Sequence, residues 1–140
     1  MTRRNQERDS ALDSPPYEFQ IGKTLTEEFL NKKSRSTALI GANDMIAFGI
    51  LAALQEQGCK VPEDYSVCGF DNIFTSSIIS PQLTTIDHRL IARCRSAVDL
   101  ISQIDTSHNH LPRDVLLADR IEYTPRLVVR NSTGIATSRK

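Results

Sequence analysis

Two pairs of neighbouring polar side chains are the residues of this chain best suited to bind a small molecule. Asn43 and Asp44 come just after the apolar run 37–41, and Asp71 and Asn72 come just after the apolar run 65–70. Each pair joins a carboxamide to a carboxylate, so it offers both hydrogen-bond donors and acceptors. Neither carboxylate has a Lys, a His or a second acid at the spacing of a base–nucleophile pair. The predicted chemistry is therefore binding rather than catalysis.

The sequence predicts an α/β fold that brings these pairs together, a parallel sheet flanked by helices. Residues 37–41 and 65–69 have the composition of short buried strands, and residues 44–57 between them form a helix that Asn43 can cap. A strand–helix–strand unit is right-handed, and its two strands are parallel. Because ligands bind beyond the carboxyl ends of parallel strands, both polar pairs should face one cleft.

The remaining elements follow from hydrophobic periodicity and from turn signals. Helices are predicted at 17–33 and 89–104, where apolar residues recur at helical spacing. Residues 83–86 are predicted to form a third strand, and residues 115–118, 121–124 and 127–130 short terminal strands. Residues 1–14 are polar and are expected to be a flexible leader, and residues 135–140 a disordered tail.

Composition and charge limit the possible partners. The chain has 140 residues, 39% of them hydrophobic, which fits one ordinary soluble domain. Its 17 basic and 17 acidic residues cancel, so no overall positive field would attract nucleic acid. No apolar run approaches the roughly 18 residues of a membrane helix, and no apolar stretch follows the basic N-terminus. No membrane partner is expected, and the predicted location is cytoplasmic.

The cysteines and histidines give no indication of a metal site. Cys59, Cys68 and Cys94 lack CxxC spacing, so they are predicted to be reduced and structural. His108 and His110 have no acidic or Cys partner at metal-ligand spacing and are interpreted as solvated. No cofactor is expected.

Four segments in order, residues 37–49, 58–72, 80–86 and 125–134, resemble the effector-binding core and carboxyl terminus of the LacI/GalR family of bacterial transcription regulators. The resemblance covers about residues 15–134. It implies a part of a two-lobed, periplasmic-binding-protein-like (type I) domain, non-enzymatic, which binds a sugar-like or nucleobase-like effector between its lobes. In such regulators operator DNA is bound by an N-terminal helix-turn-helix.

Placed in this family, the chain corresponds to the second lobe and to a crossover segment, 89–124, that enters the first lobe. The helix-turn-helix and the first lobe would precede this sequence, so we expect a fragment or a truncated reading frame. The apolar stripe of helix 89–104, formed by Leu90, Cys94, Val98 and Ile101, would then lack its partner. We expect a chain in this state to self-associate or to be marginally stable.

The resemblance also implies four ligand-binding residues: Tyr17, Asn43, Asp71 and His88. Tyr17 would stack on the ligand, and Asn43 and Asp71 would bond its hydroxyl groups, whereas Asp44 and Asn72 would hold the turns. His88 stands where many relatives carry Gln, which leaves the ligand open. Each residue has a structural alternative: a helix staple for Tyr17, a cap for Asn43, a turn for Asp71 and a surface position for His88.

A second set of residues corresponds to family positions at a two-fold dimer contact: Phe48, Leu51, Ile78 and Ile79. An isologous patch of large apolar side chains would let the chain form a homodimer. The alternative is that these residues complete the core. For the whole chain, the alternative functions are a small flavodoxin-like enzyme, which would use Asp44 or Asp71 as an acid or a phosphoryl acceptor, and a soluble binding protein without a DNA role.

Overall fold

The computed structural model describes residues 16–32, 34–103 and 122–136. Its elements are α2 (Tyr17–Asn31), β1 (Ala38–Ile40), α3 (Asp44–Glu56), β2 (Ser66–Cys68), η1 (Phe74–Ser77), β3 (Thr85–Asp87), α4 (Leu90–Gln103) and β4 (Arg126–Val128). The three predicted helices are confirmed within two residues at each end. The predicted strands 37–41 and 65–69 are each one residue shorter at both ends.

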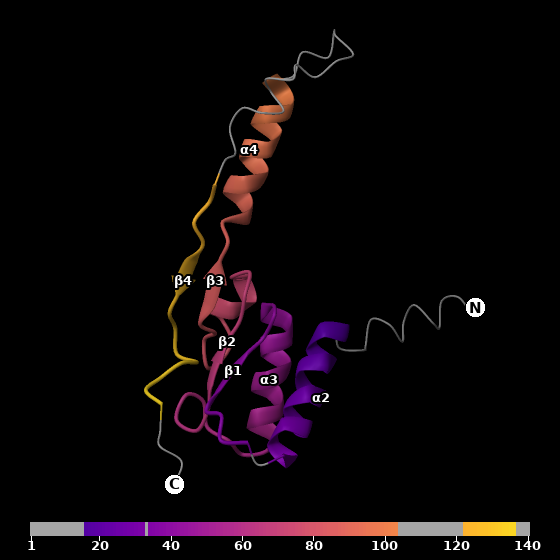
Figure 1. Cartoon of the computed structure of the whole chain (residues 1–140), viewed down its shortest axis with the longest axis vertical. Helices are drawn as coiled ribbons and strands as arrows, with labels where there is room; N and C mark the ends of the chain where they lie inside the picture. Colours follow the sequence, from indigo (N-terminus) through magenta and orange to yellow (C-terminus); the bar gives the residue numbers. More distant parts are fainter. Residues whose placement is uncertain (1–15, 33, 104–121, 137–140) are drawn as a thin grey trace, which may run out of the picture.

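The sheet is parallel where the sequence predicts it. β1 pairs with β2 in the register Ala38 to Ser66, Leu39 to Val67 and Ile40 to Cys68. The third strand joins β2 through a parallel bridge between Cys68 and Thr84, and then continues as β3 in an antiparallel pair with β4. In Figure 1 the strands, α3 and α2 form successive layers, with α2 outermost.

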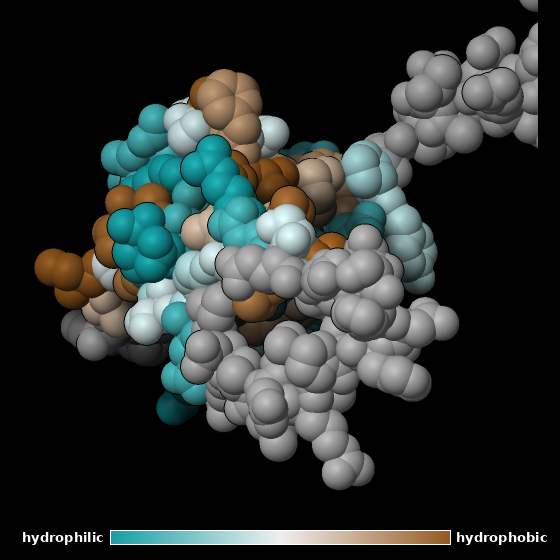
Figure 2. Space-filling view, turned by 90° about the horizontal axis from the view of Figure 1, so that it is seen from above, coloured by the Kyte–Doolittle hydropathy of each residue, from teal (hydrophilic) through white to brown (hydrophobic). Residues whose placement is uncertain are grey.

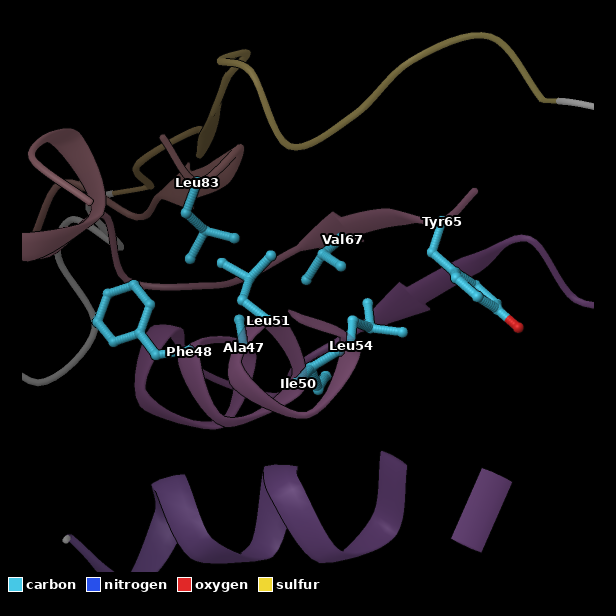
Figure 3. Packing of buried hydrophobic residues seen from close by; sticks show 8 residues of the cluster. All are labelled: Ala47, Phe48, Ile50, Leu51, Leu54, Tyr65, Val67 and Leu83. Atoms are coloured by element: carbon cyan, nitrogen blue, oxygen red, sulfur yellow. The ribbon is translucent and has the colours of Figure 1, made fainter. Parts of the chain in front are cut away.

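The core lies between α3 and the strands. Ala47, Phe48, Ile50, Leu51 and Leu54 of α3 pack against Tyr65, Val67 and Leu83 of the sheet side (Figure 3). Most of α3 is apolar because the helix is covered on two sides, by the strands and by α2. Burial of each large aliphatic side chain contributes about 1.5–3 kcal/mol, so this cluster holds the strand–helix–strand unit together.

Two glycines allow α2 and α3 to approach each other at backbone distance. A Cβ atom added to Gly22 would lie 2.1 Å from the carbonyl oxygen of Ile46, and one added to Gly49 would lie 2.0 Å from that of Phe19. Both distances are far below van der Waals contact. The helices are therefore closer than any side chain at these two positions would permit.

Ser132, which is fully buried, joins the C-terminal segment after β4 to the sheet by hydrogen bonds. Its hydroxyl donates to the carbonyl of Val67 at 2.6 Å and accepts from the backbone N–H of Thr84 at 2.8 Å. The backbone N–H of Val67 also donates to the carbonyl of Ser132 at 2.7 Å. The segment thus ties β2 to the strand that follows η1.

The terminal strands differ in part from the prediction. The strand expected at 127–130 is β4, shifted one residue toward the N-terminus at its start, and it runs antiparallel to β3. Residues 122–124 were expected in a strand and form none. There Tyr123 instead turns toward α4, where its hydroxyl bonds the Ser96 hydroxyl and donates to the Ala92 carbonyl. The predicted strand 115–118, the leader 1–14 and the loop histidines lie outside the described residues.

Replacing Ser132 with Ala is expected to lower the free energy of unfolding by about 1–3 kcal/mol, because the Thr84 N–H and the Val67 carbonyl would both lose a buried partner. Urea denaturation measures the change. Ser102→Ala is the matched control, since this exposed hydroxyl donates to the Asp99 carbonyl within its own helix. Equal urea midpoints for Ser132→Ala and Ser102→Ala would contradict the role of Ser132 in joining the C-terminal segment to the sheet.

Helix α4 projects away from the rest of the described structure (Figure 1). Its apolar side chains are exposed, among them Leu90, Ile91, Val98 and Ile101. This exposure agrees with the expectation that the apolar stripe of this helix lacks its packing partner. A hollow of about 500 Å³ lies along this face. Figure 2, seen from above, shows brown apolar side chains among teal polar ones at the surface. Within the described residues, no helix is both long enough and apolar enough to cross a bilayer.

Candidate ligand site

The loops that follow β1 and β2 are tied to each other at the carboxyl edge of the sheet. The backbone N–H of Gly41 donates to the Cys68 carbonyl, and that of Asp44 donates to the Phe70 carbonyl, both at 2.8 Å. The two polar pairs therefore lie at one edge, as the parallel arrangement predicts.

Asp44 is a structural residue at the centre of this edge. It is fully buried, and its Oδ1 accepts from the Thr85 hydroxyl at 2.5 Å. Its Oδ2 accepts from the Ser76 hydroxyl at 2.6 Å and from the backbone N–H of Ile73 at 2.9 Å. This one carboxylate joins α3, η1 and β3, which agrees with the prediction that Asp44 holds the turns rather than a ligand.

Asn72 also has the structural role expected of it. Its Oδ1 accepts from Nη2 of Arg130 at 2.7 Å, and its backbone N–H donates to the Thr85 hydroxyl at 3.3 Å. The Arg130 Nη1 donates to the Leu83 carbonyl at 2.7 Å. Arg130 thus fixes the loop after β2 to the terminal segment, a role that sequence reasoning did not assign.

Asp71 has a backbone conformation that L-residues rarely adopt. Its φ is 110°, and that of Asn72 is 53°. Such conformations cost about 1–3 kcal/mol each and persist where the surrounding structure holds them. Here the backbone N–H of Asp71 donates to the Ile86 carbonyl at 3.0 Å. The Asp71 side chain remains 39% exposed, so the strained turn holds a carboxylate at the surface.

His88 lies next to Asp71 in the structure. Nε2 of His88 lies 3.3 Å from Oδ1 of Asp71, and the imidazole is only 17% exposed. The ring stacks on Phe70 with a centroid distance of 5.6 Å and an interplanar angle of 15°. Nη1 of Arg93 lies 3.2 Å from Nδ1 of the same ring. His88 is therefore held on three sides rather than lying free on the surface.

Phe70 and Arg93 were missed by sequence reasoning. Phe70 directly precedes Asp71, and its position in an apolar run suggested only a core residue. Arg93 lies five residues after His88 on the polar side of a helix, where charged residues are common.

Asn43 caps α3, as its structural alternative predicts. Its Oδ1 accepts from the backbone N–H of Ile46 at 2.8 Å, and its own backbone is extended, with a φ of −145°. The cap uses the carbonyl oxygen of the side chain. The amide –NH₂ is the part of Asn43 that suits a ligand.

Tyr17 begins α2 and is 78% exposed. It borders a shallow hollow of about 270 Å³ with Gln20, Ile21, Thr24 and Leu25. The starts of α2 and α3 lie at the same end of the molecule (Figure 1). Among the described residues, no hydrogen bond or ring contact joins Tyr17 to Asp71 or His88. The structure thus groups Asp71 with His88 and leaves Tyr17 apart.

Cys68 ends β2 beside this edge. Burial raises the pKa of its thiol, the nearby Asp44 carboxylate raises it further, and a backbone hydrogen bond with Gly69 lowers it. The thiol is therefore protonated at neutral pH, which disfavours a nucleophilic role. Within the described part of the chain, no group of three His, Cys, Asp or Glu residues could hold a metal ion.

The four residues expected at a dimer contact fall into two groups. Phe48 and Leu51 are buried in the core of the single chain, the place that their structural alternative gives them. Ile79 is half-buried against that core, and Ile78 is 64% exposed. A dimer contact stays a prediction, and Ile78 is the member of the set with surface available for it.

Comparisons with known proteins agree with this architecture. The chain matches the periplasmic binding protein-like domain over residues 3–133. It is 37% identical over 103 residues to the HTH-type transcriptional repressor PurR of Glaesserella parasuis serovar 5 (strain SH0165), over 74% of this chain and 30% of the relative.

Solved structures show the same relationship. A LacI family transcriptional regulator from Silicibacter pomeroyi matches 86% of this chain and 40% of its own, with a TM-score of 0.70 and 31% identity. A LacI family regulator from Enterococcus faecium with bound ribose matches 86% of this chain and 42% of its own, with a TM-score of 0.66 and 29% identity.

The chain spans 30% of the length of the Glaesserella relative. The family match covers most of the chain, and the matched proteins are named as transcriptional regulators. The chain therefore belongs to the periplasmic binding protein-like family and corresponds to part of the effector-binding domain of LacI/GalR-type transcription regulators.

Proposed function

We propose that this chain supplies one side of the effector site of a LacI/GalR-type regulator, with Asp71 as its principal ligand-binding residue. The observation that carries the proposal is the exposed Asp71 carboxylate, held on a strained turn at the carboxyl edge of a parallel sheet. Strained backbone of this kind clusters at functional sites. The edge is also the place where α/β sheets bind ligands.

The effector is a small molecule with hydroxyl or N–H groups. Asp71 accepts charge-assisted hydrogen bonds from these groups, and the Asn43 amide donates to an oxygen of the ligand. His88 contributes at the rim of the site, beside Asp71. Tyr17, at the same end of the molecule, offers an apolar ring face on which a sugar or a base stacks. The Enterococcus neighbour with bound ribose supports a sugar-like effector.

The rest of the regulator completes the site and binds the operator. The matched relatives are about three times as long as the aligned part of this chain, and they are named as transcriptional regulators. The chain has no net charge, so DNA contact belongs to a helix-turn-helix elsewhere in the protein. The regulator acts in the cytoplasm as a homodimer, and Ile78 contributes to the dimer contact.

Replacing Asp71 with Ala is expected to weaken effector binding at least about tenfold, because a charge-assisted hydrogen bond is worth about 1.5–3 kcal/mol. Isothermal titration and thermal shift would be run with ribose, a disaccharide and purine bases, on this chain and on the protein that contains it. Asp99→Ala is the matched control, an exposed carboxylate on α4. Unchanged affinity in Asp71→Ala would remove Asp71 from the site.

A second variant separates binding from folding. Glycine adopts positive φ without strain, so Asp71→Gly is expected to keep the fold at least as stable as Asp71→Ala while losing the same ligand contact. Loss of binding in both variants, with melting temperatures near that of the unmodified chain, supports the proposal. If both Asp71→Ala and Asp71→Gly lost binding only because they lost their folded structure, this result would contradict a direct role of the Asp71 carboxylate in binding.

A further inference from the structure

His88 lies between two groups of opposite charge, one at each ring nitrogen. Oδ1 of Asp71 is 3.3 Å from Nε2, and Nη1 of Arg93 is 3.2 Å from Nδ1. Phe70 stacks on the ring face, which fixes the plane of the imidazole. Asp71 and Phe70 come from the loop after β2, His88 directly follows β3, and Arg93 lies in the first turn of α4.

The chemistry of Arg93 decides which ring nitrogen carries the hydrogen. A guanidinium has donors and no acceptor, and it keeps its charge at every pH that proteins tolerate. Nδ1 of His88 must therefore offer its lone pair to Arg93. In the neutral ring the hydrogen then sits on Nε2, which faces the Asp71 carboxylate. The tautomer of a histidine is commonly set in this way by the partner of its other nitrogen.

The other charged groups nearby have partners of their own. Asp87, one residue before His88, accepts from the backbone N–H of Arg89 at 2.7 Å and lies 3.5 Å from Nη2 of Arg126 on β4. The guanidinium of Arg89 lies over the ring of Tyr123, 5.6 Å from its centroid. Within the described residues, Asp71 and Arg93 are thus the charged groups in direct contact with the His88 ring.

We propose that Arg93 and His88 are positioning residues for Asp71. Arg93 holds His88 as the Nε2–H tautomer, and this hydrogen, directed toward Oδ1, fixes the carboxylate so that Oδ2 faces the ligand. The inference rests on the proposed function, in which Asp71 binds the effector. It also links the site to α4, because Arg93 is on that helix and Arg89, with a φ of 59°, turns the chain into it.

The tautomer can be tested without any ligand. Long-range ¹H–¹⁵N spectra of the whole chain would be recorded at mildly alkaline pH, with His88→Gln used to assign the signals. We expect the Nε2–H pattern for His88 and a loss of that preference in Arg93→Ala. Arg93→Lys should restore it in part, and Arg95→Ala, which removes a neighbouring charge of α4, should leave it unchanged.

The orientation of Asp71 is read from its carboxylate ¹³C signal in the same variants. We expect this signal to move in Arg93→Ala and to stay in place in Arg95→Ala. An Nδ1–H pattern in the unmodified chain would overturn the inference. The inference would equally be overturned if neither the His88 nor the Asp71 signal responded to Arg93→Ala.

Ligand binding gives the functional readout. With ribose, the disaccharide or a purine base as the probe, affinity is expected to fall about threefold to tenfold in Arg93→Ala, the range for a single hydrogen bond. Arg93→Lys should stay within about twofold and Arg95→Ala should be unchanged. Binding that is lost in Asp71→Ala but intact in Arg93→Ala would overturn the positioning role alone. If no probe bound the unmodified protein, the proposed function would fail for these ligands, and the two NMR signals would still decide the inference.

Discussion

Replacing Asp44 with Ala is expected to lower the free energy of unfolding by about 3–5 kcal/mol, a larger effect than that of any other substitution proposed for this chain. The carboxylate is fully buried and accepts from Thr85, Ser76 and the backbone of Ile73. Each buried donor left without its acceptor costs about 1–3 kcal/mol before relaxation. Because Ile73 and Ser76 belong to η1 and its cap, and Thr85 to β3, loss of the Asp44 carboxylate also loosens η1 and β3 against α3. Urea denaturation followed by circular dichroism measures the change.

Two control variants distinguish the loss of the buried hydrogen bonds of Asp44 from the loss of a negative charge. Asp44→Asn keeps the shape but turns one acceptor into a donor, so it should be intermediate between Ala and the unmodified residue. Glu56→Ala removes an exposed carboxylate that lies 2.8 Å from Nζ of Lys23, and it should move the unfolding midpoint far less. A Glu56→Ala effect as large as that of Asp44→Ala would contradict the network.

Replacing Gly49 with Ala is expected to cost about 2–3 kcal/mol of stability, although Ala is the better helix former by about 1 kcal/mol. The new Cβ would lie 2.0 Å from the Phe19 carbonyl oxygen and 2.8 Å from the Lys23 nitrogen. Both obstacles are backbone atoms of α2, so no side-chain rotation relieves the clash. The helices must separate, which opens the cluster between them.

Gly22→Ala should behave in the same way, because its Cβ would meet the Ile46 carbonyl oxygen at 2.1 Å. Gln55→Ala is the control on the exposed side of α3 and is expected to stay within about 0.5 kcal/mol. Thermal and urea unfolding of the three variants test the point. Stabilisation by either glycine replacement would show that helix propensity outweighs the close approach.

Local patterns predicted a large part of this fold. The parallel unit 37–69 was predicted because apolar runs of strand length flank a helix that has a cap at Asn43 and a glycine at its end. The different roles within each polar pair were also predicted, with Asp44 and Asn72 holding the turns. The burial of Asp44 and its three contacts confirm the first of these roles, and the bond to Arg130 confirms the second.

Other features were beyond the reach of sequence reasoning because they join residues far apart in the chain. Ser132 reaches Val67 across 65 positions, and Arg130 reaches Asn72 across 58. A serine or an arginine in the C-terminal segment gives no local sign of such a partner. Residues 122–124, which the sequence predicted to lie in a strand, form none for a related reason: Tyr123 bonds α4 rather than a neighbouring strand.

Side-chain exposure was also decided by tertiary packing. The sequence favoured a dimer interface for Phe48 and Leu51, with a core position as the alternative, and the structure buries both against the strands. Helix α4 shows the converse, a periodic apolar stripe that stays exposed in the described structure. Helical periodicity specifies which residues share a face, but it does not specify what covers that face.

The sequence by itself determined the strand–helix–strand unit and the edge at which Asn43 and Asp71 lie, because period, caps and turn residues act over a few positions. Tertiary structure alone decided that Asp71 faces His88, that Arg93 reaches the same ring from α4, and that the turn at Asp71 has a positive φ. These features depend on the angle at which separate elements meet. That angle is set by the packing of the whole chain rather than by any local pattern.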